Sequence, residues 1–189
     1  RLSVGKVFKT DITNASRTML FNINTLRWDD ELLKLFDIPK SLLPEVVHSD
    51  SCFGSLSELG DITIHAVLGD QQAALFGQGC LEKGQLKSTY GTGCFIMSNV
   101  GDEPIHSEDG LLTTIGFSLN GKVYYAIEGS IYASGTTVQW LRDNLQFFDK
   151  SDKSEIYLNE DGNANNVLFI PAFTGLGAPY WNCLLYTSD

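Results

Sequence analysis

Three segments of the chain repeat apolar residues with the period of an α-helix. Residues 29–36 begin with acidic side chains, place leucine and phenylalanine at helical spacing and are followed by Pro39, which predicts a short amphipathic helix. Residues 71–78 are mostly small or apolar and end among glycines, as a helix that stops there would. Apolar residues recur at intervals of three and four over 138–148, which predicts a third helix capped by Ser134.

Runs of apolar and β-branched residues predict the strands. These runs cover residues 62–68, 85–90, 94–98, 111–119, 123–127 and 167–170. The first and the last are continuous apolar runs, which are typical of buried strands. Gly91-Thr92-Gly93 joins one pair of runs and Asn120-Gly121 joins another, so each pair is predicted to form a hairpin. Residues 42–60 have no clear period and are expected to be irregular, and the polar stretch 10–18 is expected to be a loop that enters a helix.

Hairpins followed by a helix and a further strand indicate an α/β domain that begins near residue 80. The preceding residues would then be the end of another domain. The predicted division is therefore residues 1–79 and residues 80–189. The chain begins with Arg1, and residues 182–189 show neither helical periodicity nor a capping signal, so we expect both ends to be interruptions of a longer protein.

Composition narrows the class of protein. The chain has 189 residues, 43% of them hydrophobic, which is enough to form a packed core, and it has no apolar run of the roughly 20 residues that cross a bilayer. Thirteen basic against 23 acidic residues give a net charge of −10, which argues against nucleic acid as a partner. The four cysteines are scattered, as in a cytosolic protein with reduced thiols.

Asp70 is the first residue with a position that suggests chemistry. It follows a predicted strand and precedes a predicted helix, at the carboxyl end of a strand, where open α/β sheets bind ligands. A carboxylate there can act as a general base. The same position suits the N-cap of a helix that starts at Gln71, and position alone favours this capping role.

A second group of candidates could bind phosphate. Gly91-Thr92-Gly93 offers backbone amides and a hydroxyl, although from the local pattern alone an ordinary turn is the better explanation. Ser134-Gly135 lies at a predicted strand-to-helix junction, where phosphate binding and simple capping are both open, and Gln139 lies one turn further along. The three histidines share no metal-ligand spacing, so no metal site is predicted.

Seven segments, taken in order, carry a family resemblance. They are residues 10–20, 69–78, 89–95, 110–114, 128–130, 139–143 and 171–181. Their sequence, order and spacing resemble the FGGY family of carbohydrate kinases, and several of them are similar to the glycerol kinases within that family. The residues after Trp181 depart from the family pattern, so residues 182–189 are expected to be a truncation or a sequence artefact.

The resemblance implies an α/β fold of two ribonuclease H-like, actin-like domains. Residues 1–79 would be the C-terminal part of the first domain, and residues 80–189 the N-terminal part of the second. It also implies ATP-dependent phosphorylation of glycerol to sn-glycerol 3-phosphate, with Mg²⁺ accompanying ATP. The implied parent protein is a cytoplasmic homo-oligomer that neither inserts into membranes nor binds nucleic acid.

Specific positions acquire roles through the same resemblance. Asp70 would be the base that accepts the proton of the attacking hydroxyl. The other implied site residues are Gln71 and Phe95 for the substrate and Thr92, Gly135 and Gln139 for the nucleotide. Two alternatives stay open: another sugar kinase of the family, and a non-catalytic piece that is inactive and aggregates by itself because its sheet edges lack partners.

Overall fold

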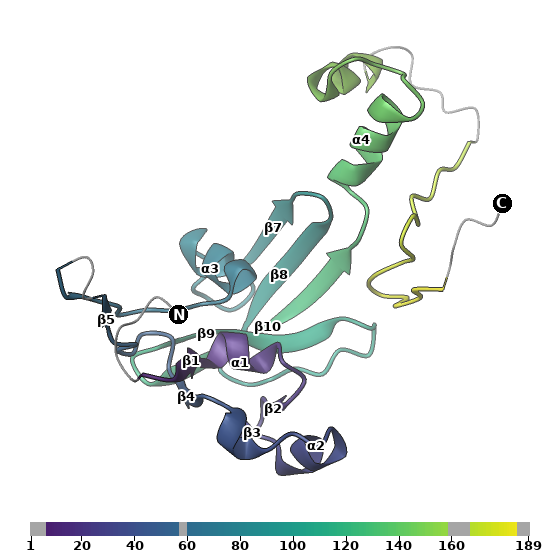
Figure 1. Ribbon diagram of the computed structural model, residues 1–189. Helices are drawn as coiled ribbons and strands as arrows, with labels where there is room; N and C mark the ends of the chain where they lie inside the picture. The colour runs from purple at the N-terminus through teal and green to yellow at the C-terminus, as the bar shows by residue number, and fades with distance from the viewer. Residues whose placement is uncertain (1–6, 57–59, 159–166, 185–189) are drawn as a thin grey trace. The chain divides into compact units, whose positions relative to one another are not determined.

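The computed structural model describes residues 7–56, 60–158 and 167–184 (Figure 1). The helices are α1 (Ile12–Ser16), α2 (Asp30–Leu35), α3 (Asp70–Gly77) and α4 (Gly135–Asp143), with 3₁₀ turns η1 (Lys40–Leu42) and η3 (Ser151–Leu158). The strands are β1 (Lys9–Asp11), β2 (Phe21–Asn22), β3 (Arg27–Trp28), β4 (Glu45–Val47), β5 (Ser55–Leu56), β6 (Ile62–Thr63), β7 (Leu86–Tyr90), β8 (Cys94–Gly101), β9 (Leu112–Leu119) and β10 (Lys122–Ile131).

The longest strands form one four-stranded sheet in the order β7-β8-β10-β9. Strands β9 and β10 are antiparallel, and the two residues that join them, Asn120 and Gly121, have φ angles of 51° and 76°. Positive φ at both positions matches the right-handed twist of the flanking strands, which is why Asn-Gly is favoured there. This hairpin and the one formed by β7 and β8 are confirmed as predicted.

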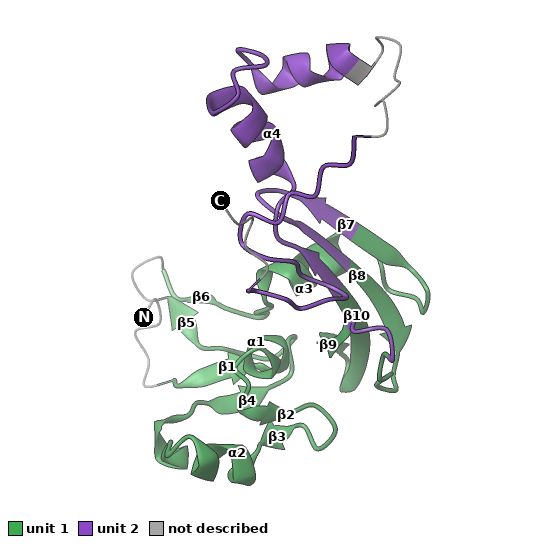
Figure 2. Ribbon diagram, turned by 90° about the vertical axis from the view of Figure 1, so that its right-hand side faces the viewer, with its two compact units in different colours: residues 1–87, 97–107, 112–128 green, residues 88–96, 108–111, 129–189 purple. Residues whose placement is uncertain are grey.

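The chain divides into two compact units (Figure 2). Unit 1 comprises residues 1–87, 97–107 and 112–128, and unit 2 comprises residues 88–96, 108–111 and 129–189. The division passes through strands β7, β8 and β10. Each unit is therefore assembled from segments that are distant in the sequence.

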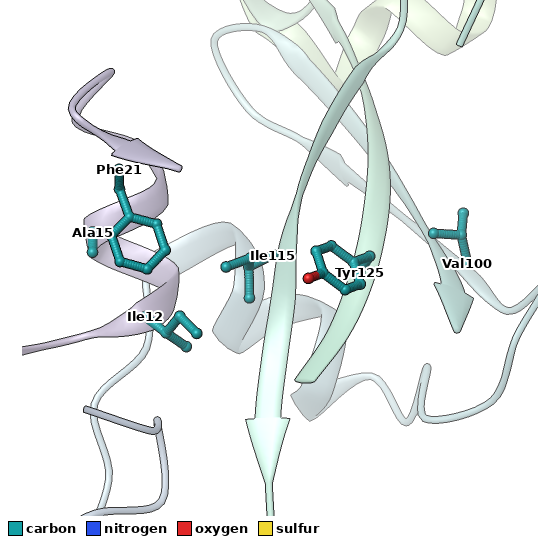
Figure 3. Close-up of a cluster of buried hydrophobic side chains, with 6 residues drawn as sticks. All are labelled: Ile12, Ala15, Phe21, Val100, Ile115 and Tyr125. Carbon is teal, nitrogen blue, oxygen red and sulfur yellow. The ribbon is translucent and has the colours of Figure 1, made fainter. Parts of the chain in front are cut away.

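The core of unit 1 joins α1 to the sheet (Figure 3). Ile12 and Ala15 lie three residues apart on α1, so they share the helix face that packs against Ile115 of β9. The other buried members of this cluster are Phe21, Val100 and Tyr125. The ring of Phe21 contacts that of Trp28 edge to face, with centroids 5.6 Å apart.

A second core cluster of unit 1 holds α3. Leu75 of α3 is fully buried with Met97, Phe117 and Ala126 of the sheet, and Cys80 completes the cluster. The ring of Phe117 also stacks on Tyr124, with centroids 4.7 Å apart. This packing fixes one side of α3 to the sheet and so limits where its first residue can lie.

An ion pair also crosses unit 1. The guanidinium of Arg17, which follows α1, donates to both carboxylate oxygens of Glu128 on β10, each at 3.1 Å. Glu128 is only 2% exposed whereas the Arg17 side chain is 44% exposed. The two charge-assisted hydrogen bonds offset part of the hydration that the buried carboxylate loses.

Unit 2 contains α4 and the aromatic side chains around it. The ring of Trp140 stacks on Phe169, with centroids 5.6 Å apart, and lies 5.2 Å from the ring of Phe173. The backbone near residue 177 lies close to β10, because Ala178 donates its amide to the Ser130 carbonyl at 2.9 Å. A Cβ at Gly177 would lie 2.0 Å from that same carbonyl oxygen, so this approach requires glycine.

Two predicted buried strands are wrong. In the run 62–68, only Ile62 and Thr63 form a strand, β6, and both residues are exposed because β6 pairs only with the two-residue β5. Residues 167–170 form no strand in the described part of the chain, and their side chains are 51–91% exposed. An apolar run reports a preference for burial but does not supply the neighbouring strand that burial requires.

Two further predictions need correction. The segment expected to be irregular, residues 42–60, contains β4, which pairs in parallel with the distant strand β1. The helix predicted over 138–148 begins at Gly135 and ends at Asp143, because Gln146 has φ of 55° and cannot continue it. The helices predicted over 29–36 and 71–78 are confirmed to within two residues.

Candidate functional site

Asp70 is the first residue of α3. The N-cap is Gly69, which has extended backbone angles, so the interpretation of Asp70 as the N-cap is wrong by one residue. The Asp70 side chain is exposed, and its Oδ2 atom lies 3.4 Å from Nε2 of Gln71. The carboxylate is thus not used to close the start of the helix and is accessible from solvent.

A buried carboxylate lies under this helix start. Asp11 caps α1 and is 0% exposed, and its oxygens accept from Thr13 N at 2.9 Å, Thr13 Oγ1 at 2.6 Å and Asn14 N at 3.0 Å. They also accept from Asn14 Nδ2 at 2.6 Å and from Ser49 Oγ at 2.9 Å. Five donors replace the water that burial removes, which lets the carboxylate stay in the interior.

Thr13 connects this carboxylate to α3. Its hydroxyl donates to Asp11, so its oxygen lone pairs are free to accept, and they accept the Gly69 amide at 2.9 Å. Gly69 immediately precedes Asp70. The chain of bonds from Asp11 through Thr13 therefore fixes the backbone from which the Asp70 side chain projects.

Two further side chains hold the first turn of α3. Lys87 of β7 is 2% exposed, and its ammonium donates to Oε1 of Gln71. Gln72 is likewise 2% exposed and donates from Nε2 to the Ile115 carbonyl at 3.4 Å. Asp70 thus lies on a helix turn that buried polar groups fix on more than one side.

In unit 2 the loop between β7 and β8 packs against the start of α4. Thr92 O accepts the Ser134 amide at 2.9 Å and the Thr136 hydroxyl at 3.0 Å, and Gly91 O accepts the Gly135 amide at 2.9 Å. The Gly135 amide is therefore occupied by the loop itself. The Thr92 side chain is exposed at the tip of this loop.

Glycine permits that close packing. A Cβ on Gly135 would lie 2.5 Å from the Gly91 carbonyl oxygen, and one on Gly93 would lie 2.4 Å from the Ile131 carbonyl oxygen. Both contacts are with backbone, which cannot rotate away as a side chain can. The loop 91–93 and α4 are hence positioned by backbone hydrogen bonds and by the absence of side chains.

The remaining predicted residues lie on regular elements of unit 2. Phe95 is half-buried on β8, and Gln139 is exposed on α4. The Oγ1 atom of Thr137, in the first turn of α4, is buried without a hydrogen-bond partner among the described residues. The structure thus brings Asp70 and Gln71 together in unit 1, and Thr92 and Gly135 together in unit 2.

Sequence reasoning assigned no role to three of the residues that build the unit 1 site: Asp11, Thr13 and Lys87. The first two lie in a segment that was singled out for its polar character and for the family resemblance, but neither residue was given a role in the site. Lys87 lies in the predicted strand 85–90. On such a strand the apolar Leu86 would be expected to point toward the core, yet Leu86 is 59% exposed and Lys87 is buried. The pattern of apolar and polar residues therefore did not predict that a lysine would lie on the buried face of this strand.

The described part of the chain has neither a metal-ligand cluster nor a helix that could span a membrane. In residues 7–56, 60–158 and 167–184, no three histidine, cysteine or acidic side chains are grouped so as to hold a metal ion. The four cysteines are free thiols, with Cys80 and Cys94 buried and Cys52 and Cys183 exposed. None of the helices in these ranges has both the length and the apolar character needed to span a bilayer.

Comparison with known families decides the relationship. Residues 1–77 match the N-terminal domain of the FGGY family of carbohydrate kinases, and residues 86–185 match the C-terminal domain of that family. The chain belongs to the FGGY family. The resemblance noted in the seven segments is thereby confirmed.

Curated relatives of this FGGY chain are glycerol kinases. The chain is 52% identical over 185 residues to the glycerol kinase of Natranaerobius thermophilus and 55% identical over 185 residues to that of Alteromonas mediterranea. Each match covers 96% of this chain and 37% of the relative. The chain thus spans little more than a third of the length of the proteins that it matches.

Solved structures agree on the fold. The Plasmodium falciparum glycerol kinase with ADP superposes with a TM-score of 0.86 at 40% identity, covering 98% of this chain and 38% of that one. A gluconate kinase from Lactobacillus acidophilus gives 0.78 at 22% identity, covering 93% of this chain and 37% of its own. These neighbours confirm the predicted fold class, the α/β actin-like fold of FGGY kinases, of which this chain contains a part.

Proposed function

We propose that the chain is part of a glycerol kinase that transfers the γ-phosphate of ATP to glycerol and forms sn-glycerol 3-phosphate. Curated relatives at 52–55% identity are glycerol kinases, and a solved relative at 40% identity holds ADP. The observation that carries the proposal is the exposed Asp70 carboxylate on a helix start that buried polar groups fix. The proposal concerns the parent protein, the longer protein of which this chain is proposed to be a part.

Asp70 is proposed as the general base. Phosphoryl transfer requires a hydroxyl that is held in line with the γ-phosphate and gives up its proton as the new bond forms. An exposed carboxylate can accept that proton. Gln71, next to Asp70 and oriented by Lys87, and Phe95 are proposed to contact the polyol.

Unit 2 is proposed to contact the nucleotide. The exposed Thr92 side chain and the Gly135 backbone lie on one packed loop and helix start, and Gln139 lies one turn along the same helix. MgATP is proposed as the second substrate. The backbone hydrogen bonds of the loop favour this role, because a preorganised backbone loses little freedom when phosphate binds.

A boundary between two family domains is proposed near residue 80, with residues 1–79 before it and residues 80–189 after it. The family matches over 1–77 and 86–185 support this division. The parent protein is further proposed to be a cytoplasmic homo-oligomer, as the family resemblance implies.

Glycerol phosphorylation by the parent protein with MgATP tests the activity. Wild type and Asp70→Asn are compared, with Asp30→Asn as the control, because Asp30 is also the exposed first residue of a helix. Loss of a general base lowers kcat by about 10² to 10⁴-fold, so Asp70→Asn should lose activity whereas Asp30→Asn keeps it.

Other acceptors test the substrate class. Xylulose and gluconate are assayed beside glycerol, because kinases for these sugars share the fold. A parent protein that prefers one of them would contradict the glycerol assignment, and an active Asp70→Asn variant would contradict the role of Asp70. The isolated chain of 189 residues is expected to be inactive, since it spans 37% of its relatives.

A further inference from the structure

Lys87 is a buried lysine, whereas the other lysine and arginine side chains in the described part of the chain are at least partly exposed. It is 2% exposed, and no other lysine or arginine within residues 7–56, 60–158 and 167–184 is in the buried class. Removing an ammonium from water is costly unless acceptors replace its hydration. Apolar residues of similar size are often at least as stabilising as a buried charge, so the lysine points to a functional explanation.

The strand that carries Lys87 also inverts the usual alternation. Leu86 is 59% exposed while Lys87 faces inward, toward the first turn of α3. On a half-buried strand the apolar side chain normally points to the core and the charged one to solvent. The inversion places the ammonium against Gln71, one residue beyond Asp70.

The bond to Lys87 determines which way the Gln71 amide faces. A lysine ammonium only donates, so the group that it contacts on Gln71 has to be the carbonyl oxygen, Oε1. The amide nitrogen, Nε2, then lies on the other side, 3.4 Å from Oδ2 of Asp70. With Lys87 in place, Gln71 presents two N–H donors toward Asp70 and the space beside it.

We propose that Lys87 is a positioning residue for phosphoryl transfer: through its bond to Oε1 it holds the Gln71 amide so that Nε2 donates to Asp70 and to the oxygen of the attacking hydroxyl. This inference rests on the proposed function of Asp70. The proton of the hydroxyl passes to Asp70 while its oxygen forms the bond to phosphorus and the bond from phosphorus to the leaving oxygen of ADP breaks. An N–H donor favours the oxygen that is losing its proton, whereas a carbonyl oxygen in the same place would repel it.

The test uses the parent protein with Lys87→Met, Lys87→Arg and Gln71→Ala, and the double variant Lys87→Met with Gln71→Ala. Methionine fills the buried volume without a charge. Loss of one positioned donor should lower kcat/KM for glycerol about 30-fold in Lys87→Met and in Gln71→Ala, with KM for MgATP changed less than about twofold. Lys122→Met, an exposed lysine at the start of β10, is the control and should match wild type.

The double variant separates positioning from a merely structural role. If Lys87 acts through Gln71, the two losses do not add, and the double variant is no more than about twofold worse than either single variant. Lys87→Arg keeps a donor to Oε1 and should recover part of the lost activity. A double variant whose loss is the product of the two single losses would overturn the proposal, and so would wild-type kcat/KM in Lys87→Met.

If Lys87→Met does not fold, the variant Gln71→Glu tests the proposed role of the Gln71 N–H donor. The glutamate keeps an oxygen for Lys87 but has no N–H donor for Asp70 or for the hydroxyl. We expect thermal unfolding at or above the wild-type temperature and kcat/KM for glycerol at least about 30-fold lower. Wild-type activity in Gln71→Glu would overturn the inference.

The outcome for Asp70→Asn distinguishes the two proposals. If Asp70→Asn is inactive while Lys87→Met and Gln71→Glu are both fully active, the inference about Lys87 fails and the proposed function stands. If Asp70→Asn itself is fully active, the proposed function fails, and the inference about Lys87 fails with it.

Discussion

The candidate residues of unit 1 and those of unit 2 are held in place by different kinds of interaction. In unit 1 buried polar side chains, Asp11, Thr13 and Lys87, fix the helix start that carries Asp70. In unit 2 backbone hydrogen bonds and closely packed glycines fix the loop 91–93 against α4. The first arrangement depends on side-chain chemistry and the second on the lack of side chains.

This contrast predicts opposite sensitivities to mutation. Unit 1 should lose stability when a polar group is deleted, because the hydrogen-bond partners of that group are left buried and unpaired. Unit 2 should lose stability when a side-chain atom is added, because the backbone that the new atom contacts cannot move aside.

Asp11→Ala should have the largest effect on stability. It leaves buried donors of Thr13, Asn14 and Ser49 without their acceptor and releases the Gly69 end of α3, and we expect a loss of about 3 kcal/mol in the free energy of unfolding. Urea denaturation of the parent protein measures it. Asp102→Ala, at an exposed position, is the control and should change stability by less than about 0.5 kcal/mol. An equal effect of the two substitutions would contradict the role of buried polar groups in unit 1.

Gly135→Ala should destabilise unit 2 by about 2 kcal/mol, because its Cβ would lie 2.5 Å from the Gly91 carbonyl oxygen. We also expect the KM for MgATP to rise severalfold while the KM for glycerol changes little. Gly77→Ala is the matched control, since a Cβ at that helical glycine meets nothing within 4 Å. Alanine should be tolerated or slightly stabilising there. Unchanged stability in Gly135→Ala would show that the loop is not closely packed.

Arg17→Met tests the ion pair of unit 1 with a smaller expected effect. The variant leaves the Glu128 carboxylate, which is 2% exposed, without the guanidinium that bonds to both of its oxygens. Because the arginine is 44% exposed, solvent screens part of the interaction, and we expect a loss of about 1 kcal/mol. A double-mutant cycle with Glu128→Gln measures the coupling. Additive losses would mean that the pair contributes nothing of its own.

Asp29 should give the smallest effect, and one that depends on pH. Its pKa is lowered first by the hydrogen bond from Asn22 and then by the amide of Leu32 at the start of α2. A carboxyl whose pKa is lower in the folded state adds stability above its unfolded pKa and loses it as pH falls through the lowered, folded value. Carboxyl NMR titration should therefore show Asp29 titrating below a free aspartate, and Asn22→Ala should reduce the difference. Titration at the ordinary value would contradict this contribution.

Local features of the fold could be predicted from the sequence. The Asn120-Gly121 hairpin and helix α3 were predictable because the turn chemistry and the helical period lie within a few consecutive residues. Strand β4 was missed because its partner β1 lies more than 30 residues earlier. The runs 62–68 and 167–170 were mistaken for buried strands because an apolar run does not reveal whether a partner strand exists.

Some candidate site residues could likewise be predicted from the sequence and others could not. Asp70 and Gln71 were found because a family motif and a predicted strand-to-helix junction mark them, although the structure has no strand directly before α3. Asp11 was not found because its meaning depends on Ser49 and on the Thr13 hydroxyl that holds Gly69, which only folding brings near. Lys87 was not found because nothing in the sequence indicates that it, rather than Leu86, faces inward.

The most direct test of the account measures turnover and nucleotide binding together in Asp70→Asn. Asp70 in unit 1 is proposed to activate the acceptor, whereas Thr92 and Gly135 in unit 2 are proposed to contact the nucleotide. We therefore expect the variant to have a kcat for glycerol lowered at least about 100-fold, with a Kd for MgATP, measured by calorimetry, within about twofold of wild type. Wild-type turnover would contradict the account, and so would a loss of MgATP binding as large as the loss of kcat.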